Sequence, residues 1–228
     1  MDATKIGEYR TKAKKWGRRN YRDFPWRRTQ EPYKVLLAEI MLHRTQAIQV
    51  ARIYEGVIEE YPNIQALAKA SRSVLHKSLS TLGLRWRIDL IKDMVEAIVN
   101  KYESRIPKDK SELMSLPGIS EYIACSVRCF AWNIAEPLRD TNTIRVIGRI
   151  YNIDVKDSSR RNSSFRELVV ELVDPEEPRA YNFALLDLAD QICTKKEEPK
   201  CNECPLNKLC LYNGERQIKR LKTIVGVA

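Results

Sequence analysis

The sequence has no run of about 18 uncharged apolar residues, so a transmembrane helix is not expected. Its start, MDATKIGEYRTKAKK, lacks the apolar segment and the cleavage site of a secretory signal, which indicates an intracellular protein. No internal repeat and no low-complexity tract occurs, which argues against a repeat architecture. Alternating strand patterns are scarce, so β-sheet is not expected to dominate the fold.

The composition fits a folded, basic protein. The 228 residues allow one large domain or two smaller ones around a cleft, and 43% of them are hydrophobic. The formal charge of +10 favours a polyanionic partner, either nucleic acid or anionic lipid. Arginines gather in residues 1–28 between aromatic residues, as a nucleic-acid contact or as a solvated basic face.

The apolar period is helical along most of the chain, which predicts an all-α fold. The segment 33–44 is apolar on most faces and is expected to be a buried helix. Asn63 and either Ser71 or Ser73 are expected to cap two short helices. The further helices are predicted at 46–61, 63–70, 71–83, 88–102, 111–115, 122–132, 142–151, 164–173 and 181–191.

Four of the six cysteines lie in one short segment with the spacing Cys193-x7-Cys201-x2-Cys204-x5-Cys210. Thiolates are soft ligands that suit zinc or an iron–sulfur cluster. Zinc sites usually combine two close cysteine pairs, whereas this segment has only one close pair, so the spacing favours a cluster over zinc. The other two cysteines, Cys125 and Cys129, are expected to be ordinary core residues.

Two further patterns precede the cysteines. The segment LMSLPGISEYIACSV, residues 113–127, predicts two helices joined by a tight turn at Gly118 and Ser120, whose amides can hold a backbone phosphate. Asp140 follows in LRDTNTIRVIGR, just before a predicted helix. By itself it is most simply a helix N-cap.

The helix-hairpin-helix, Asp140 and the cysteine segment, in this order, resemble the endonuclease III superfamily of DNA glycosylases over about residues 20 to 212. The resemblance implies two helical lobes with the active site in the cleft between them. One would be a six-helix barrel lobe containing the hairpin, at 24–134. The other, 1–23 with 135–228, would hold a [4Fe-4S] cluster in the loop 193–210. DNA would lie across the cleft with the target base flipped into it.

Within this superfamily, DFPWR at 23–27 and PYKVLLAEIMLHRTQ at 32–46 resemble the thymine–guanine mismatch glycosylases most, and the MutY-type adenine glycosylases next. The MutY type typically reads Gln-Gln-Thr at 43–45 and Asp-Gly-Asn at 140–142, where this chain has His-Arg-Thr and Asp-Thr-Asn. It also usually carries a further C-terminal domain, for which the chain is expected to be too short after Cys210. All three features favour the mismatch type.

The resemblance assigns roles to residues on both lobes. Asp140 would be the catalytic carboxylate that stabilises positive charge on the sugar and orients water, with Asn142 steering it. Glu39, inside an apolar helix, would be a pocket acid whose pKa burial raises, although an exposed charge is the simpler alternative. Tyr122 stands where bifunctional members carry a nucleophilic lysine, so strand cleavage is expected to be weak or absent; the alternative is a tyrosine that only packs.

The resemblance also assigns DNA contacts. Leu84 would be the apolar wedge that fills the stack, with Arg85 beside it, and Arg44 would donate to the orphaned guanine. Two departures concern the hairpin, where Ser120 replaces a second glycine and Glu121 follows it. A serine is strained in a left-handed backbone, and a carboxylate repels phosphate, so we expect a weaker or altered phosphate site. The first cysteine spacing is also one residue longer than usual, which a loop can absorb.

The sequence therefore predicts a monomeric, monofunctional glycosylase of base excision repair that removes thymine or uracil opposite guanine. Its partners would be mismatched double-stranded DNA and a downstream abasic-site endonuclease, with no membrane contact. Two alternatives stay open: a MutY-type enzyme that removes adenine opposite guanine or 8-oxoguanine, and an iron–sulfur DNA-binding protein without catalysis.

Overall fold

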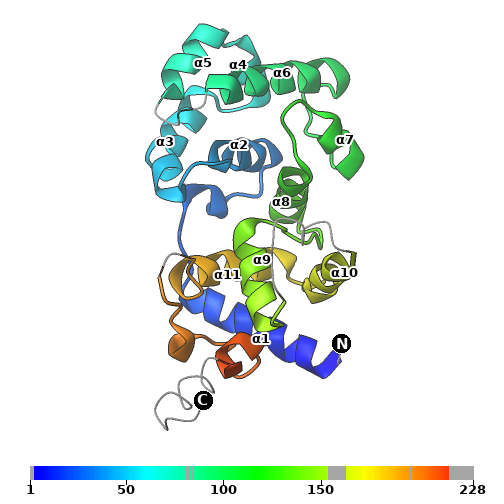
Figure 1. Ribbon diagram of the computed structural model, residues 1–228. Coiled ribbons are helices and arrows are strands. Elements are labelled where there is room, and N and C mark those ends of the chain that lie inside the picture. Colours follow the sequence, from blue (N-terminus) through cyan, green and yellow to red (C-terminus); the bar gives the residue numbers. More distant parts are fainter. Residues whose placement is uncertain (1–2, 81–82, 84, 154–162, 196, 216–228) are drawn as a thin grey trace. The chain divides into compact units, whose positions relative to one another are not determined.

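The computed structural model describes residues 3–80, 83, 85–153, 163–195 and 197–215 (Figure 1). These residues form α-helices and short 3-10 helices without any β-strand, which confirms the expected all-α class. None of the described helices is long and apolar enough to cross a membrane. The chain divides into two compact units: unit 1 comprises Met1–Arg22 and Ala135–Ala228, and unit 2 comprises Asp23–Ile134.

Unit 2 contains seven α-helices in its described part. The predicted lobe has six helices, which is the number obtained when the short consecutive helices α4 and α5 are counted as one. Helix α2 packs against α3 and α8, and α6 packs against α4 and α5. The helices are η1 (Pro25–Arg28), α2 (Pro32–Leu42), α3 (Ala47–Glu60), α4 (Ile64–Lys69), α5 (Arg72–Ser78), α6 (Arg85–Lys101), α7 (Lys110–Ser115) and α8 (Glu121–Trp132).

Capping residues set the starts of the short helices. The Asn63 side chain accepts a hydrogen bond from the Ala66 amide at 2.9 Å, and Ser71 accepts one from the Val74 amide. Both satisfy amides that have no partner inside the helix. The predicted caps are therefore confirmed, with Ser71 rather than Ser73 in the second position.

Unit 1 is built around α11, which packs against both α1 and α9 (Figure 1). Its helices are α1 (Ala3–Arg19), α9 (Thr141–Ile150), α10 (Ser163–Leu172) and α11 (Pro178–Gln191), with the short 3-10 helix η4 (Cys201–Glu203) in the cysteine segment. Their buried apolar residues form one core, against which three of the four clustered cysteines also pack. The cysteine segment is thus part of this core.

Helix α1 was not predicted, because lysines and arginines dominate its sequence. Its buried residues are only Ile6, Tyr9, Ala13 and Gly17, a narrow stripe at helical spacing. Gly17 allows close packing, since a Cβ there would lie 2.4 Å from the Ala184 Cβ of α11. On the same interface, the buried Tyr9 and Tyr181 hydroxyl groups lie 3.2 Å apart. Much of the basic N-terminal segment is therefore a packed helix as well as a charged surface.

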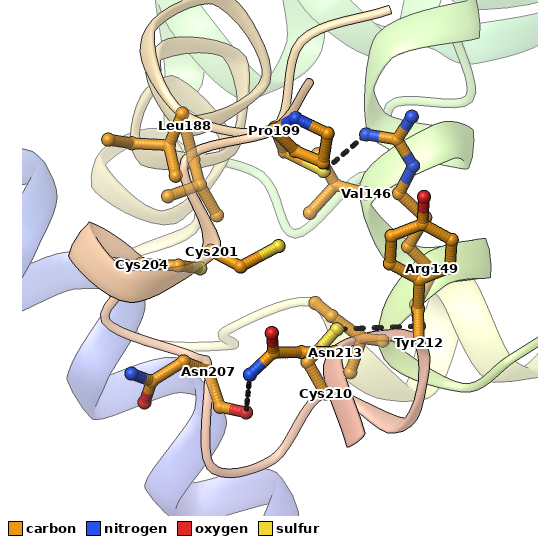
Figure 2. A pocket seen from close by; sticks show the side chains of 13 residues that line it. Val146, Arg149, Leu188, Pro199, Cys201, Cys204, Asn207, Cys210, Tyr212 and Asn213 are labelled. Atoms are coloured by element: carbon orange, nitrogen blue, oxygen red, sulfur yellow. Dashed lines mark hydrogen bonds between the residues drawn. The ribbon is translucent and has the colours of Figure 1, made fainter. Parts of the chain in front are cut away.

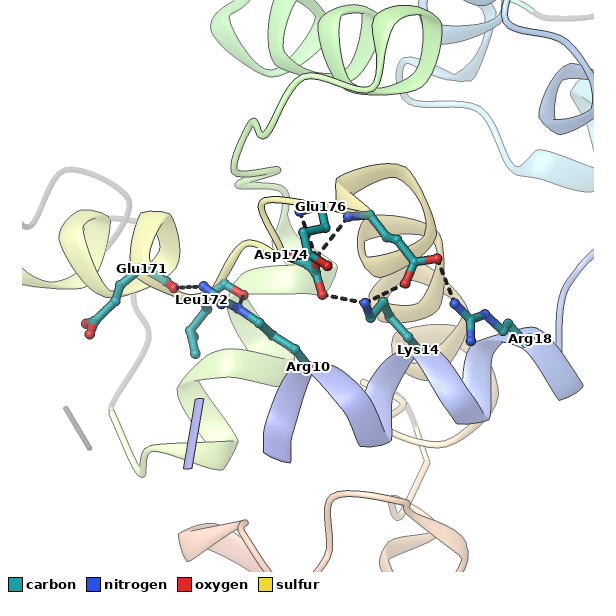
Figure 3. A network of polar contacts seen from close by, with 8 residues as sticks. Arg10, Lys14, Arg18, Glu171, Leu172, Asp174 and Glu176 are labelled. Atoms are coloured by element: carbon teal, nitrogen blue, oxygen red, sulfur yellow. Dashed lines mark hydrogen bonds and ion pairs between the residues drawn. The ribbon is translucent and has the colours of Figure 1, made fainter. Parts of the chain in front are cut away.

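The polar side of α1 is tied to the segment between α10 and α11 (Figure 3). The Lys14 ammonium lies 2.6 Å from a carboxylate oxygen of buried Asp174 and 2.6 Å from one of Glu177. Burial raises the pKa of Asp174, but the hydrogen bond from Lys14 and two backbone amides outweigh it and hold the pKa below its usual value. Lys14 and Arg18 lower the pKa of Glu177 in the same way.

We expect Lys14→Met to lower the free energy of unfolding at pH 7 by about 1–3 kcal/mol, less than for a fully buried pair because Glu177 is partly exposed. Carboxylates with lowered pKa values stabilise the fold fully above the unfolded value of about 4, and that contribution disappears as pH falls through the folded values. The difference between variant and native protein should therefore shrink at pH 3 in urea titrations. Lys15→Met, at an exposed neighbour, is the control. A difference that stays constant with pH would contradict the ion-pair account.

Candidate functional site

Asp140 is the N-cap of α9, as the simplest interpretation of its position predicted. Its Oδ1 accepts hydrogen bonds from the Asn142 amide at 3.1 Å and the Thr143 amide at 2.8 Å, and Thr143 Oγ1 accepts one from the Asp140 amide. The Asn142 side chain also donates to Asp140 Oδ2 at 2.8 Å. Within the described part of the chain, Oδ2 accepts no other hydrogen bond, so it can still accept one from water or a ligand.

Asn142 is itself held by Arg145, one turn further along α9. Arg145 Nη1 donates to Asn142 Oδ1 at 3.1 Å. The same guanidinium donates to the carbonyl oxygens of Cys193 at 2.9 Å and Ala189 at 3.0 Å. The Asp140–Asn142 pair is therefore connected through Arg145 to the end of α11 and the start of the cysteine segment. Besides the two amide hydrogen bonds of a helix N-cap, the Asp140 carboxylate is therefore held by the Asn142 side chain, which Arg145 holds in turn.

The four clustered cysteines line one hollow of about 380 Å³, the part open to solvent included. None of the chain's six cysteines, all of which are described, is in a disulfide. Figure 2 shows Cys201 and Cys204 on one side of the hollow and Arg149 on the other, with the Cys210 sulfur near the Arg149 backbone carbonyl. Apolar side chains complete the lining, among them Val146, Ile150, Leu188 and Ile192.

Arg149 places a positive charge beside the sulfur atoms. Its Nη1 donates to Cys193 Sγ at 3.3 Å and to the Thr194 carbonyl at 2.9 Å, and its guanidinium lies over the Tyr212 ring. Burial raises the pKa of the Cys204 thiol to about 12 and also raises the pKa of Cys210. These thiols stay protonated at neutral pH unless a metal displaces the protons.

The four cysteine thiols around this hollow form a donor set that suits a thiolate-bound metal centre. Among the residues that the structure describes, no three His, Cys, Asp or Glu side chains lie close enough together to hold a single metal ion. In a four-iron cluster each cysteine binds a different iron, so the sulfurs stand farther apart than around one tetrahedral zinc. Four thiols that line one hollow are consistent with such a cluster.

The hairpin has the predicted form, with α7 and α8 joined by a turn at 116–120. Gly118 has φ +77°, in the region that favours glycine, and a Cβ there would lie 3.2 Å from Leu90. Ser120 has φ −80° and is the N-cap of α8, accepting a hydrogen bond from the Ile123 amide. The expected strain at Ser120 was wrong, because the left-handed position in this turn is Gly118 alone.

Glu121 was expected to repel a phosphate at the hairpin, but its carboxylate has an ion-pair partner. Lys110 Nζ of α7 lies 3.3 Å from Glu121 Oε1 at the start of α8. The ion pair offsets the negative charge that would face a phosphate at this hairpin, while two exposed side chains contribute little to stability. The expected repulsion is thus reduced by a residue eleven positions earlier in the chain.

Glu39 and Tyr122 lie on two helices of unit 2 that pack together, α2 and α8. Glu39 is 5% exposed, so the alternative of an exposed surface charge is wrong. Helix α2 buries nearly every side chain, as predicted, although it ends at Leu42, two residues before the predicted end. Tyr122 is half-buried in the first turn of α8. Cys125 and Cys129 are core residues of α8, as predicted.

Arg44 lies in the loop between α2 and α3, with an exposed side chain and φ +60°. Leu84 lies outside the described residues, as does the side chain of Arg85, the first residue of α6. Three arginines with structural roles were not singled out from the sequence: Arg145, Arg149 and Arg87. The spacing of Arg145 and Arg149 from Asn142, three and seven residues, could have indicated both, since residues one and two turns apart share a helix face.

Comparisons with known proteins agree with this geometry. The family described as HhH-GPD superfamily base excision DNA repair protein matches residues 37–171. A thymine/uracil-DNA glycosylase of Pyrobaculum aerophilum is 38% identical over 95% of this chain and 95% of its own length. A thymine-DNA glycosylase of Aeropyrum pernix is 36% identical over 93% of this chain and 97% of its own. The solved structure of a thermostable thymine-DNA glycosylase superposes with a TM-score of 0.87 at 29% identity, covering 93% of this chain and 98% of that one.

Proposed function

Because this chain belongs to the HhH-GPD superfamily of base excision DNA repair proteins, we propose that it is a DNA glycosylase that hydrolyses the N-glycosidic bond of thymine or uracil mispaired with guanine in duplex DNA. The observation that carries the proposal is the held carboxylate of Asp140. Two amides and Asn142 orient it, and one oxygen keeps the capacity to accept a further hydrogen bond. A carboxylate that served only as a cap would not need the Asn142–Arg145 support.

Cleavage of the glycosidic bond builds positive charge on the sugar, as in other glycoside hydrolyses. In our proposal Asp140 stabilises that charge and orients the attacking water, while Asn142, held by Arg145, fixes the carboxylate. Glu39 is the second acid, which handles a proton in the base pocket after the base is flipped. The protein contributes a preorganised charge, so little reorganisation is needed as the bond breaks.

Cys193, Cys201, Cys204 and Cys210 would hold a [4Fe-4S] cluster, with Arg149 beside the Cys193 sulfur. When bound, the cluster crosslinks the segment 193–210 and orders it. Arg145 bonds the Cys193 carbonyl, so an ordered segment also keeps Arg145 and Asn142 in place. The proposed role of the cluster is therefore to position residues.

In the proposed complex, a phosphate of duplex DNA binds at the turn amides of Gly118 and Ser120. Arg44 donates to the guanine left unpaired, and Leu84 and Arg85 fill or flank the gap in the stack. Arg44 has no hydrogen bond or ion pair within the described part of the chain, so its guanidinium is available. The abasic product would pass to a separate abasic-site endonuclease, and a monomer would suffice for the reaction.

The test is a panel of labelled duplexes, each with one mispair, incubated with the native protein and then treated with alkali. Breaks should appear in thymine–guanine and uracil–guanine duplexes and should depend on the alkali. Breaks only at adenine opposite guanine or 8-oxoguanine would show that the protein is a MutY-type adenine glycosylase. Tight binding without breaks in any duplex would support the non-catalytic alternative.

Tyr122→Lys is expected to add strand cleavage that the native protein lacks. A lysine amine can form a Schiff base with the sugar, and its position in the first turn of α8 favours the neutral, nucleophilic amine. Borohydride should trap a covalent complex with the variant but not with native protein or Tyr122→Phe. Strong alkali-independent cleavage by native protein would instead reveal another nucleophile.

A further inference from the structure

The loop that carries Arg44 is held by a buried arginine of another helix. Arg87, in the first turn of α6, is 2% exposed. Its Nη1 donates to the Met41 carbonyl at 2.9 Å and to Thr45 Oγ1 at 3.0 Å, and its Nη2 donates to the His43 carbonyl. These three acceptors lie on both sides of Arg44. The guanidinium therefore fixes the two ends of a turn whose exposed residue is Arg44.

The buried position of the Arg87 cation is expected to lower the stability of the fold. A cation in the first turn of a helix faces the positive end of the helix dipole. No carboxylate pairs with Arg87 in the described part of the chain, and its buried Nε has no hydrogen-bond partner there. Buried charges without a counter-charge usually destabilise a fold. What Arg87 does provide is three hydrogen bonds to one short loop at the end of α2.

That loop holds a strained conformation. Arg44 has φ +60°, which a non-glycine side chain adopts rarely and at an energetic cost, and such strain is found where the surroundings impose it. A second contact ties the loop to α6, since the His43 ring packs edge-on against Trp86 with centroids 6.0 Å apart. Burial, Arg87 and Arg44 lower the pKa of His43, so His43 adds no charge to the loop at neutral pH.

We propose that Arg87 is a positioning residue for base recognition: it holds the Met41–Thr45 turn so that Arg44 is presented to the base opposite the flipped nucleotide. The inference rests on the proposed function, in which Arg44 contacts that base. Arg87 would not touch DNA. Its effect would pass through Arg44 and would appear as selectivity for the opposite base.

The experiment uses binding, which does not require turnover. Duplexes carry a tetrahydrofuran abasic analogue opposite either guanine or cytosine, and fluorescence anisotropy gives the ratio of the two affinities. Native protein should prefer guanine by roughly tenfold, since a good arginine–guanine pair has an effect of that order. Arg44→Ala and Arg87→Met should each reduce the ratio towards one, and Arg87→Lys, which keeps the charge but not the fork, should give an intermediate value. Arg72→Met is the control, because Arg72 is an exposed arginine at the start of α5 that pairs with Asp89 and Asp93 of α6 and does not contact the Met41–Thr45 turn.

A double-mutant cycle separates positioning from general damage. If Arg87 acts through Arg44, Arg87→Met should change the ratio no further when Arg44 is already alanine. Two results would overturn the inference: a double variant in which the effects of the two single substitutions on the ratio multiply, or an Arg87→Met variant that loses affinity equally for both duplexes. Should Arg87→Met fail to fold, Thr45→Val, which removes one acceptor of Arg87, gives a milder test with the same expected direction. Base release from a thymine–guanine duplex is measured in parallel. If native protein releases no base, the proposed function is refuted. If native protein releases the base normally but Arg87→Met leaves the affinity ratio unchanged, only this inference is refuted.

Discussion

Asp140→Asn is expected to bind mismatched duplex as tightly as native protein and to release the base roughly 10²–10³ times more slowly, the effect of losing one well-placed electrostatic group. Asparagine is as good an N-cap as aspartate, so its side-chain oxygen can keep the two hydrogen bonds from the Asn142 and Thr143 amides. The substitution therefore removes the charge and leaves the helix start intact. Single-turnover base release and thermal unfolding, measured on the same sample, check both halves of this expectation.

The chain contains a matched control. Asp109 is the N-cap of α7 and accepts hydrogen bonds from the Ser111 and Glu112 amides, with the same local geometry as Asp140. Asp109→Asn should leave the rate of base release within a factor of a few of native protein. Near-normal release by Asp140→Asn, equal to that of Asp109→Asn, would return Asp140 to a purely structural role.

Cys201→Ser is expected to abolish the yellow-brown colour of the purified protein, a broad absorbance near about 400 nm, and to destabilise unit 1 strongly. Loss of the crosslink across the segment 193–210 should lower the free energy of unfolding by more than about 3 kcal/mol, the effect of one covalent crosslink over a loop of this size. Thermal unfolding followed by circular dichroism measures the loss, and iron and zinc analysis identifies the metal.

Cys125→Ala provides the comparison for the cysteine prediction, because Cys125 lies in the core of α8 in unit 2. That variant should keep its colour and its metal content. A colourless native protein that holds one zinc would contradict the cluster assignment. A coloured protein whose Cys201→Ser variant keeps both its colour and its stability would exclude Cys201 as a ligand.

Features that depend on neighbouring residues could be predicted from the sequence. The apolar period predicted most of the helices, and Asn63 and Ser71 indicated two helix starts because their side chains accept hydrogen bonds from amides three residues away. Helix α6 begins at Arg85, three residues before its predicted start, because two of the three additional residues are arginines and interrupt the apolar period. Gly118 was identified with the hairpin turn, and its positive φ explains why glycine stands there.

Interactions between distant segments were not readable in the same way. Helix α1 shows so few apolar residues that only its packing on α11 reveals its stripe. Arg145 bonds a carbonyl 48 residues later, and Arg87 bonds one 46 residues earlier, so sequence spacing gave no hint of either partner. The strain expected at Ser120 failed for a related reason: the family pattern of two glycines does not say which of them needs a left-handed backbone.

In our proposal, this protein releases a pyrimidine from a mispair with guanine and leaves the strand intact. The most direct measurement is of the free base itself, by chromatography and mass spectrometry, after incubation of native protein with a thymine–guanine duplex. We expect about one free thymine per duplex turned over, with full-length strands until alkali is added. Free adenine from an 8-oxoguanine duplex with no thymine from the mispair, or no free base from any duplex, would contradict it.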